Sequence, residues 1–290
     1  MKEPCEYILT LIAVIACANA PVRAQELEGA LKRIQQTKTI RLGYHESSVP
    51  FSYRDANKQP AGFTVDICSR VANGIQQQLA LDKLDVKWVL VTELNRFEMV
   101  RDGAVDVECG TSTNTLTRQK MVDFSLTIWL DGANFVVDPA RSGARKLGDL
   151  GGKKIGVVDN TTTNQVLADT LKRDYISAEI VPVDDYVAGL NALKAGKIDA
   201  FAADQAVLIG LAAAVRNQFR LLLGEQNFSY EPFALTVRRN DPDFRLAVNT
   251  VVARVLRSGQ IAEIYQRWFG SLGKPSPLLV ATWASNSLPD

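Results

Sequence analysis

The sequence has few of the residues that build metal and redox sites. Its 290 residues include one histidine, His45, and four cysteines, and these have no metal-ligand spacing. Positive and negative residues nearly balance, 33 Lys and Arg against 32 Asp and Glu, so the net charge is +1. A chain without a basic excess has no general attraction for nucleic acid. We therefore expect no metal, cofactor or nucleic-acid partner, and we favour a small ligand.

The apolar stretch near the N-terminus is too short to span a bilayer. Residues 7–20 are mainly apolar and are followed by small residues, which is typical of an export signal. We expect residues 1–24 to be a signal peptide and the mature chain to be periplasmic. The sequence VIAC at 14–17 resembles a lipobox, so a lipid anchor at Cys17 stays open as an alternative. After cleavage Cys68 and Cys109 remain, either as a disulfide or as buried thiols.

Short β-branched runs alternate with longer segments of helical period. Helices are expected at 64–80, 162–175 and 241–270, and the chain beyond Lys274 is predicted to be a poorly ordered end. This alternation predicts an α/β fold with largely parallel sheets. The expected strands are 39–44, 85–91, 104–109, 153–158, 178–183 and 198–203.

One helix–glycine–strand unit occurs twice, at 95–110 and at 185–204. Both strands end at polar residues, and ligands in open α/β sheets bind beyond the carboxyl ends of strands. Two similar lobes with a cleft between them are therefore expected. We place lobe 1 at 25–130 and 235–275, lobe 2 with the hinge strands at 131–234, and a tail at 276–290.

The stretch GTSTNTLTR, residues 110–118, carries a dense set of hydroxyl donors. If a helix begins near Thr115, its free N–H groups lie beside Thr111 and Thr113, with Arg118 one turn inside. Such a group suits a carboxylate, which a guanidinium can hold by both oxygens. The same residues could equally be an ordinary helix cap beside a solvated arginine.

Several ordered motifs resemble one known family. They are ESSVPFSYRD, GFTVDICSRVA, NRFEMVRDGAVDVECGTSTNTLTRQKMVDFS, LGDLGGKKIGVVDNTTT, LKAGKIDAFAAD and SGQIAEIYQRWFG. Across about residues 38–271 the chain is similar to the family 3 periplasmic solute-binding proteins of polar amino acid ABC transporters, most closely to the glutamate/aspartate-binding members. The resemblance implies a type II periplasmic-binding-protein fold, two α/β lobes joined by a two-strand hinge. It also implies a non-catalytic, monomeric protein that hands an amino acid to a membrane permease.

The resemblance also implies roles for particular residues. Arg118 matches the position that clamps the ligand α-carboxylate, and Asp204 the position that pairs with the α-ammonium. Asp204 is on its own sequence context an equally good N-cap for the following helix. The hydroxyl positions that aid the clamp match Thr111, Thr113, Thr162 and Thr163.

The chain departs from the acidic-ligand members where the ligand side chain is recognised. His45 stands in place of an arginine, Glu93 of a serine and Tyr186 of a histidine, whereas Arg96 matches the arginine that meets the distal carboxylate. Glutamate or aspartate is the leading ligand, but pairing of Glu93 with Arg96 would favour glutamine, asparagine or another polar amino acid. A protonated His45 would bind an acidic ligand more tightly at about pH 5.5 than at about pH 8.

Three further interpretations stay open. Phe51 and Tyr53 pack either against the ligand or into the core. A lyase or dehydratase on the same fold would need a nucleophile, for which Cys109 beside His45 is the candidate. A ligand sensor without transport would need the same closing lobes as a transport protein.

Overall fold

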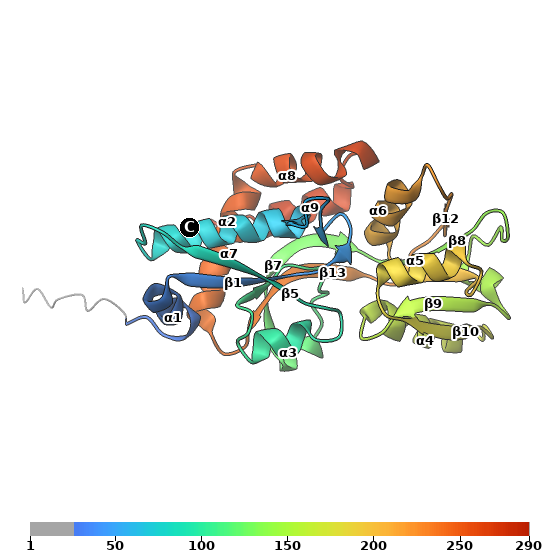
Figure 1. Cartoon of the computed structure of the whole chain (residues 1–290), viewed down its shortest axis with the longest axis horizontal. Coiled ribbons are helices and arrows are strands. Elements are labelled where there is room, and N and C mark those ends of the chain that lie inside the picture. The colour runs from blue at the N-terminus through green and yellow to red at the C-terminus, as the bar shows by residue number, and fades with distance from the viewer. Residues whose placement is uncertain (1–25, 290) are drawn as a thin grey trace, which may run out of the picture.

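The structure is a computed structural model that describes residues 26–289 (Figure 1). The expected signal peptide and Cys17 lie outside the described residues. Within 26–289, no helix has both the length and the apolar character needed to cross a membrane. The chain forms two α/β lobes, seen side by side in Figure 1, and two segments cross between them.

Lobe 1 is built on a five-stranded mixed sheet. Its order is β5 (Asp85–Leu90), β1 (Thr39–Tyr44), β6 (Val107–Glu108), β13 (Glu231–Arg238), β7 (Val122–Asp131). β1 runs parallel to β5 and β6, whereas β13 is antiparallel to β6 and β7. Around it lie α1 (Gly29–Thr37), α2 (Phe63–Gln78), α3 (Arg96–Arg101), α7 (Pro242–Arg257), α8 (Gln260–Phe269), α9 (Pro277–Asn286), the 3-10 turns Arg118–Lys120 and Gly270–Leu272, and a small sheet of β2 (Ser47–Ser48), β3 (Ser52–Arg54) and β4 (Pro60–Ala61).

Lobe 2 repeats the pattern on a smaller scale. Its sheet order is β10 (Glu179–Val183), β9 (Lys154–Val158), β11 (Ala200–Asp204), β8 (Ala133–Val137), β12 (Leu222–Leu223). The helices are α4 (Thr162–Arg173), α5 (Tyr186–Lys194) and α6 (Gln205–Val215), with a 3-10 turn at Leu147–Leu150. β9 is parallel to β10 and β11, and all five residues of β11 are buried. Continuous apolar strands of this kind are covered on both faces, which explains their sequence pattern.

Most predicted elements are confirmed with shifted ends. The strand expected at 104–109 shortens to 107–108, and the helix expected at 64–80 spans 63–78. The sequence predicts a single closing helix at 241–270. This prediction is wrong, because the segment forms two helices, α7 and α8, with a break between them. Gly259 has a left-handed φ of +80° at the break, a conformation that glycine adopts without strain.

The prediction of a poorly ordered end beyond Lys274 is also wrong. Ser276 caps α9 by accepting the Leu279 N–H at 3.1 Å. Leu279 and Trp283 are buried, and the Trp283 indole N–H donates to the Ile128 carbonyl of β7 at 2.8 Å. The tail therefore completes the core of lobe 1.

Phe51 belongs to the core of lobe 1. It is fully buried and makes edge-to-face contacts with Phe63 at 6.0 Å and Trp129 at 5.0 Å between ring centroids. Tyr53 packs edge-on against Trp268 at 6.1 Å. Of the two open alternatives, packing into the core is confirmed for Phe51; Tyr53 is half-buried, and neither ring lines the cavity between the lobes.

Candidate functional site

A narrow cavity lies between the lobes. Eight of the ten residues predicted from the sequence line it, and Thr161 joins them. The lining is His45, Glu93, Arg96, Thr111, Arg118, Thr161, Thr162, Tyr186 and Asp204.

The other two predicted residues, Thr113 and Thr163, are buried beside the cavity rather than in its lining. The Thr113 hydroxyl lies 3.1 Å from that of Thr162 and donates to Glu231 at 2.5 Å. Thr163 is the second residue of α4 and is 2% exposed. The structure thus brings all ten residues to one region, but these two do not face the ligand space.

The prediction that a helix begins near Thr115 is wrong. A single 3-10 turn, Arg118–Lys120, follows the Thr-rich loop. The Thr115 hydroxyl accepts the Arg118 N–H at 3.2 Å, and such local bonds compete with a regular helix. Threonine and asparagine also have poor helix propensity. Lobe 1 therefore offers no helix N-terminus here, and Arg118 supplies the positive charge.

Arg118 reaches the cavity from lobe 1. Its Nη1 donates to the Thr113 carbonyl at 3.0 Å, and its guanidinium lies 5.0 Å from the centre of the Phe97 ring. Burial, assisted by the nearby charge of Arg96, lowers the pKa of Arg118 to about 10. The group stays protonated near neutral pH, with several N–H donors left for an anion.

Arg96 is held on three sides at the start of α3. Its Nε donates to the Ser112 hydroxyl at 3.1 Å, Nη1 to the Glu93 carbonyl, and Nη2 to the Asn160 carbonyl at 3.2 Å. The last bond crosses from lobe 1 to lobe 2. A guanidinium has five N–H donors, so Arg96 retains donors for the cavity.

His45 lies between two carboxylates. Its Nδ1 is 3.0 Å from Glu93 and its Nε2 is 2.8 Å from Glu108. Burial alone would lower the pKa of His45, but the two carboxylates outweigh it and raise the pKa to about 9. With this pKa the imidazole stays protonated from about pH 5.5 to about pH 8, so a change in His45 charge would not produce the predicted pH dependence of acidic-ligand binding.

Glu93 and Glu108 are the anionic partners of that imidazolium. Burial would raise the pKa of Glu93, but the charge of His45 dominates and lowers it to about 2. The same balance lowers the pKa of Glu108. Thr236 on β13 donates to the second oxygen of Glu108 at 2.9 Å. The Glu93 carboxylate does not pair mainly with the Arg96 side chain, because it binds His45.

Asp204 faces the cavity from the end of β11 in lobe 2. Asp204 occupies the N-cap position of α6, as the alternative predicted, but its side chain accepts no hydrogen bond from that helix. The Ala206 N–H donates to Asp131 instead. The residue is 6% exposed, and its Oδ1 has no hydrogen-bond partner among the described residues. Burial, then the charges of Glu231 and Asp131, raise the pKa of Asp204 well above its usual range. An unpartnered buried carboxylate suits a cationic ligand group.

The first turn of α4 brings N–H groups to the same place. Thr161 is the N-cap and accepts the Asn164 N–H at 3.1 Å. The N–H groups of Thr162 and Thr163 belong to the first turn, which has no intrahelical partners for them. The positive end of the α4 dipole thus lies at the cavity. At the start of α5, burial raises the pKa of Tyr186 well above its usual value.

The two lobes touch directly around the cavity. Asn160 of lobe 2 donates through Nδ2 to the Glu93 carbonyl at 2.9 Å and accepts from Arg96. On the hinge side, Thr113 of lobe 1 meets Thr162 of lobe 2. Contacts on both sides of the cavity indicate a closed cleft.

A disulfide joins Cys68 of α2 to Cys109, which lies between β6 and the Thr-rich loop. Of the two states left open by the sequence, the disulfide is observed. The Thr64 hydroxyl also bonds the Cys109 carbonyl at 2.7 Å, so α2 holds the start of the loop. The proposed Cys109/His45 nucleophile is wrong, because the Cys109 sulfur is bonded to Cys68. A Cβ at Gly110 would collide with Glu108 and His45, so the loop needs glycine there.

Sequence reasoning missed four residues at this site: Ser112, Glu108, Asn160 and Glu231. The two glutamates carried a signal, since each lies within a largely apolar strand run: Glu108 in VDVEC, beside Asp106, and Glu231 in YEPFALTV. Buried acids in such runs need partners.

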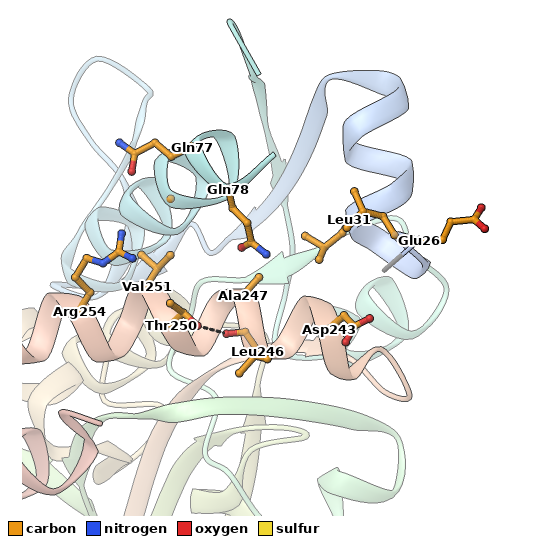
Figure 2. A pocket seen from close by; sticks show the side chains of 12 residues that line it. Glu26, Leu31, Gln77, Gln78, Asp243, Leu246, Ala247, Thr250, Val251 and Arg254 are labelled. Carbon is orange, nitrogen blue, oxygen red and sulfur yellow. Dashed lines mark hydrogen bonds between the residues drawn. The ribbon is translucent and has the colours of Figure 1, made fainter. Parts of the chain in front are cut away.

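A wider groove lies elsewhere, on lobe 1 between α1, α2 and α7 (Figure 2). Gln77 and Gln78 border it from α2 and Thr250 and Arg254 from α7. It contains none of the predicted site residues. Among residues 26–289, no group of three or more His, Cys, Asp or Glu side chains could hold a metal ion.

Comparison with known proteins gives the family. Residues 40–271 match the model of the bacterial extracellular solute-binding proteins, family 3. The chain belongs to this family. This family 3 protein is 32% identical to the L-glutamate/L-aspartate-binding protein of Pseudomonas aeruginosa, over 90% of this chain and 87% of that one. It is 28% identical to the glutamate/aspartate import solute-binding protein of Escherichia coli strain K12, over 93% and 89% of the two chains.

Solved structures agree on the fold. An ancestral arginine-binding protein bound to arginine superposes with a TM-score of 0.72 at 26% identity, covering 80% of this chain and 99% of that one. The expected type II periplasmic-binding-protein fold is confirmed.

Proposed function

We propose that this family 3 protein captures a polar α-amino acid between its lobes, outside the cytoplasm, and delivers it to the membrane permease of an ABC transporter. The observation that carries the proposal is the placement of Arg118 and Asp204 at the same cavity. They enter one closed cavity from opposite lobes, and the Asp204 Oδ1 there has no partner among the described residues. A guanidinium and an unpartnered carboxyl group in one cavity are complementary to an amino acid zwitterion, whose ammonium favours the ionised carboxyl group.

The α-carboxylate would be held by Arg118 of lobe 1 and by the N–H groups that open α4 in lobe 2. Thr111, which also lines the cavity, would add a hydroxyl donor. Both lobes then gain contacts only when the cleft is closed, so the ligand shifts the open–closed equilibrium toward closure. The same reasoning applies to Asp204 and the α-ammonium. An incoming ammonium would also lower the pKa of Asp204, which burial and the charges of Glu231 and Asp131 raise.

Glutamate and aspartate are the leading ligands. The two relatives described above are named for them, and Arg96 supplies a cation at the side-chain end of the cavity. The retained donors of its guanidinium could bind a distal carboxylate.

Glutamine or asparagine is a second candidate, favoured by Glu93. Its carboxylate lines the same cavity as Arg96 and uses Oε1 for His45. A primary amide can donate to Glu93 and accept from Arg96 at once, whereas an acidic ligand meets Glu93 as a like charge. The side-chain amide of glutamine or asparagine would therefore bind both Glu93 and Arg96.

The remaining features of the proposal concern the whole protein. We propose that it is a monomer without catalytic activity, exported by residues 1–24. We assign 25–130 and 235–275 to lobe 1, together with the terminal helix α9, and 131–234 to lobe 2 with the hinge strands. Transport and sensing need the same closed lobes, so they differ in the partner rather than in the site. Loss of ligand uptake on deletion of the gene, with chemotaxis unchanged, would support transport over sensing.

Calorimetry on the mature protein, refolded to remove carried-over ligand, tests the ligand class. Each of the twenty amino acids is titrated separately. Saturable binding of glutamate or aspartate supports the leading ligand, and binding of the amides alone supports the second candidate. If no amino acid binds, the proposed function is contradicted.

A further inference from the structure

Glu231 is the first residue of β13, where the chain returns from lobe 2 to lobe 1. It is 1% exposed and pairs in the sheet with Asp131, the last residue of β7. Both crossing segments therefore meet beside its carboxylate. A buried carboxylate needs hydrogen-bond donors, so its partners are informative.

Those donors come from both lobes. Oε2 of Glu231 accepts from the Thr113 hydroxyl of lobe 1 at 2.5 Å and from the Thr162 hydroxyl of lobe 2. Oε1 accepts from Ser229 Oγ at 2.8 Å, and Ser229 in turn accepts the Ala133 N–H at 2.7 Å. One oxygen is thus fixed to the hinge, and the other joins the two lobes.

The two threonine hydroxyls have no proton left for another acceptor. A hydroxyl has a single O–H donor, and in both residues it is directed at Glu231. They cannot therefore donate to a ligand carboxylate in this arrangement, although the sequence suggested that role. Both hydroxyls bond to Glu231, although Thr162 also lines the cavity.

We propose that Glu231 is a latch: a positioning residue that holds Thr113 and Thr162 together and so stabilises the closed cleft. The proposal rests on closure of the lobes around an amino acid, as proposed above. When the lobes separate, Thr113 moves with lobe 1 and Thr162 with lobe 2. Glu231 cannot keep both bonds, so the latch exists only in the closed state.

A latch of this kind has a kinetic signature. Encounter with the ligand occurs in the open cleft, before the latch forms, so the association rate constant is insensitive to it. Dissociation requires reopening, which breaks a hydrogen bond to a charged group. From the usual contribution of such bonds, loss of the latch should raise the dissociation rate constant about ten- to a hundredfold.

The test uses stopped-flow kinetics on the mature protein. The probe is whichever of L-glutamate, L-aspartate, L-glutamine and L-asparagine binds the wild type most tightly. The variants are Thr162→Val, Glu231→Ala and the double variant. Each should dissociate faster with little change in association. The double variant should match Glu231→Ala, because that substitution already removes the bond between Thr162 and Glu231. Thr162→Ser, which restores the hydroxyl, should restore slow dissociation.

Thr170→Val is the matched control. Thr170 lies in the same helix, α4, and is 3% exposed, but it is remote from the cavity lining, and its hydroxyl has no partner among the described residues. The same substitution there should leave both rate constants unchanged. X-ray scattering at saturating probe should show a larger radius of gyration for Glu231→Ala than for the wild type.

Two results would overturn the latch alone: unchanged dissociation in Thr162→Val and Glu231→Ala, or additive effects in the double variant. If the wild type neither binds nor closes on any of the four probes, the proposed function is contradicted as well. Failure of the latch alone is therefore distinguishable from failure of the proposed function.

Discussion

The His45 imidazole is bonded on both sides, through Nδ1 to Glu93 at 3.0 Å and through Nε2 to Glu108 at 2.8 Å. With both ring nitrogens occupied, His45 has no N–H left for a ligand. Its influence on the cavity is indirect, because it fixes the Glu93 carboxylate and neutralises part of the local negative charge. The side-chain end of the site is therefore governed by Glu93 and Arg96 rather than by the histidine.

This cluster predicts how stability depends on pH. The pKa of His45 is raised from 6.5 to about 9 in the folded protein. The stabilisation is therefore fully present below pH 6.5, the ordinary value, and is lost as the pH rises through about 9. Thermal unfolding should be measured at several pH values between these two. The Tm of the wild type should fall as the pH rises, and the Tm of His45→Gln should fall less. Parallel curves would contradict a charged His45.

Glu93 should control discrimination between acidic and amide ligands. Replacing it by serine removes the negative charge that a distal carboxylate would meet, so Glu93→Ser should raise the ratio of glutamate to glutamine affinity by about tenfold or more, equal to about 1.4 kcal/mol. Calorimetry with both ligands measures the ratio. Arg96→Gln is the opposing variant and should lower it. An unchanged ratio in Glu93→Ser would show that Glu93 does not contact the ligand side chain.

The terminal helix α9 should contribute to folding rather than to binding. Trp283 is 6% exposed and packs edge-on against Tyr265 at 5.8 Å between ring centroids. Trp283→Ala should lower the free energy of unfolding by about 3–5 kcal/mol, as large-to-small core substitutions do. Urea unfolding measures this. Val280→Ala is the control, because Val280 is 47% exposed on the same helix and should change little. A variant as stable as the wild type would mean that α9 is dispensable.

Much of the fold is predictable because its signals are local. Buried strands such as KIGVV and AFAAD are continuous apolar runs, and the helices between them keep helical spacing. The residues that line the cavity are predictable for a different reason, since they lie in motifs that resemble those of a known family. Local reasoning fails in the Thr-rich loop, where hydroxyl-to-backbone bonds replace a helix.

The rest depends on contacts between distant parts of the chain. Glu231 meets Thr113 across 118 residues, and no spacing rule links them. His45 meets Glu108 across 63 residues, so its raised pKa could not be predicted from the sequence. The tail beyond Lys274 resembles a disordered end because its proline and serine content hides a helix whose buried face is two residues, Leu279 and Trp283.

The central claim is that Arg118 and Asp204 hold the two α-groups of one amino acid. The most direct measurement is a calorimetric titration of the wild type and Asp204→Asn with the tightest-binding amino acid and with its α-hydroxy acid, which lacks the ammonium. We expect the wild type to bind the amino acid at least about thirtyfold more tightly than the hydroxy acid, the effect of about 2 kcal/mol for one buried charge pair. In Asp204→Asn that preference should largely disappear. Equal preference in the two proteins would contradict the account.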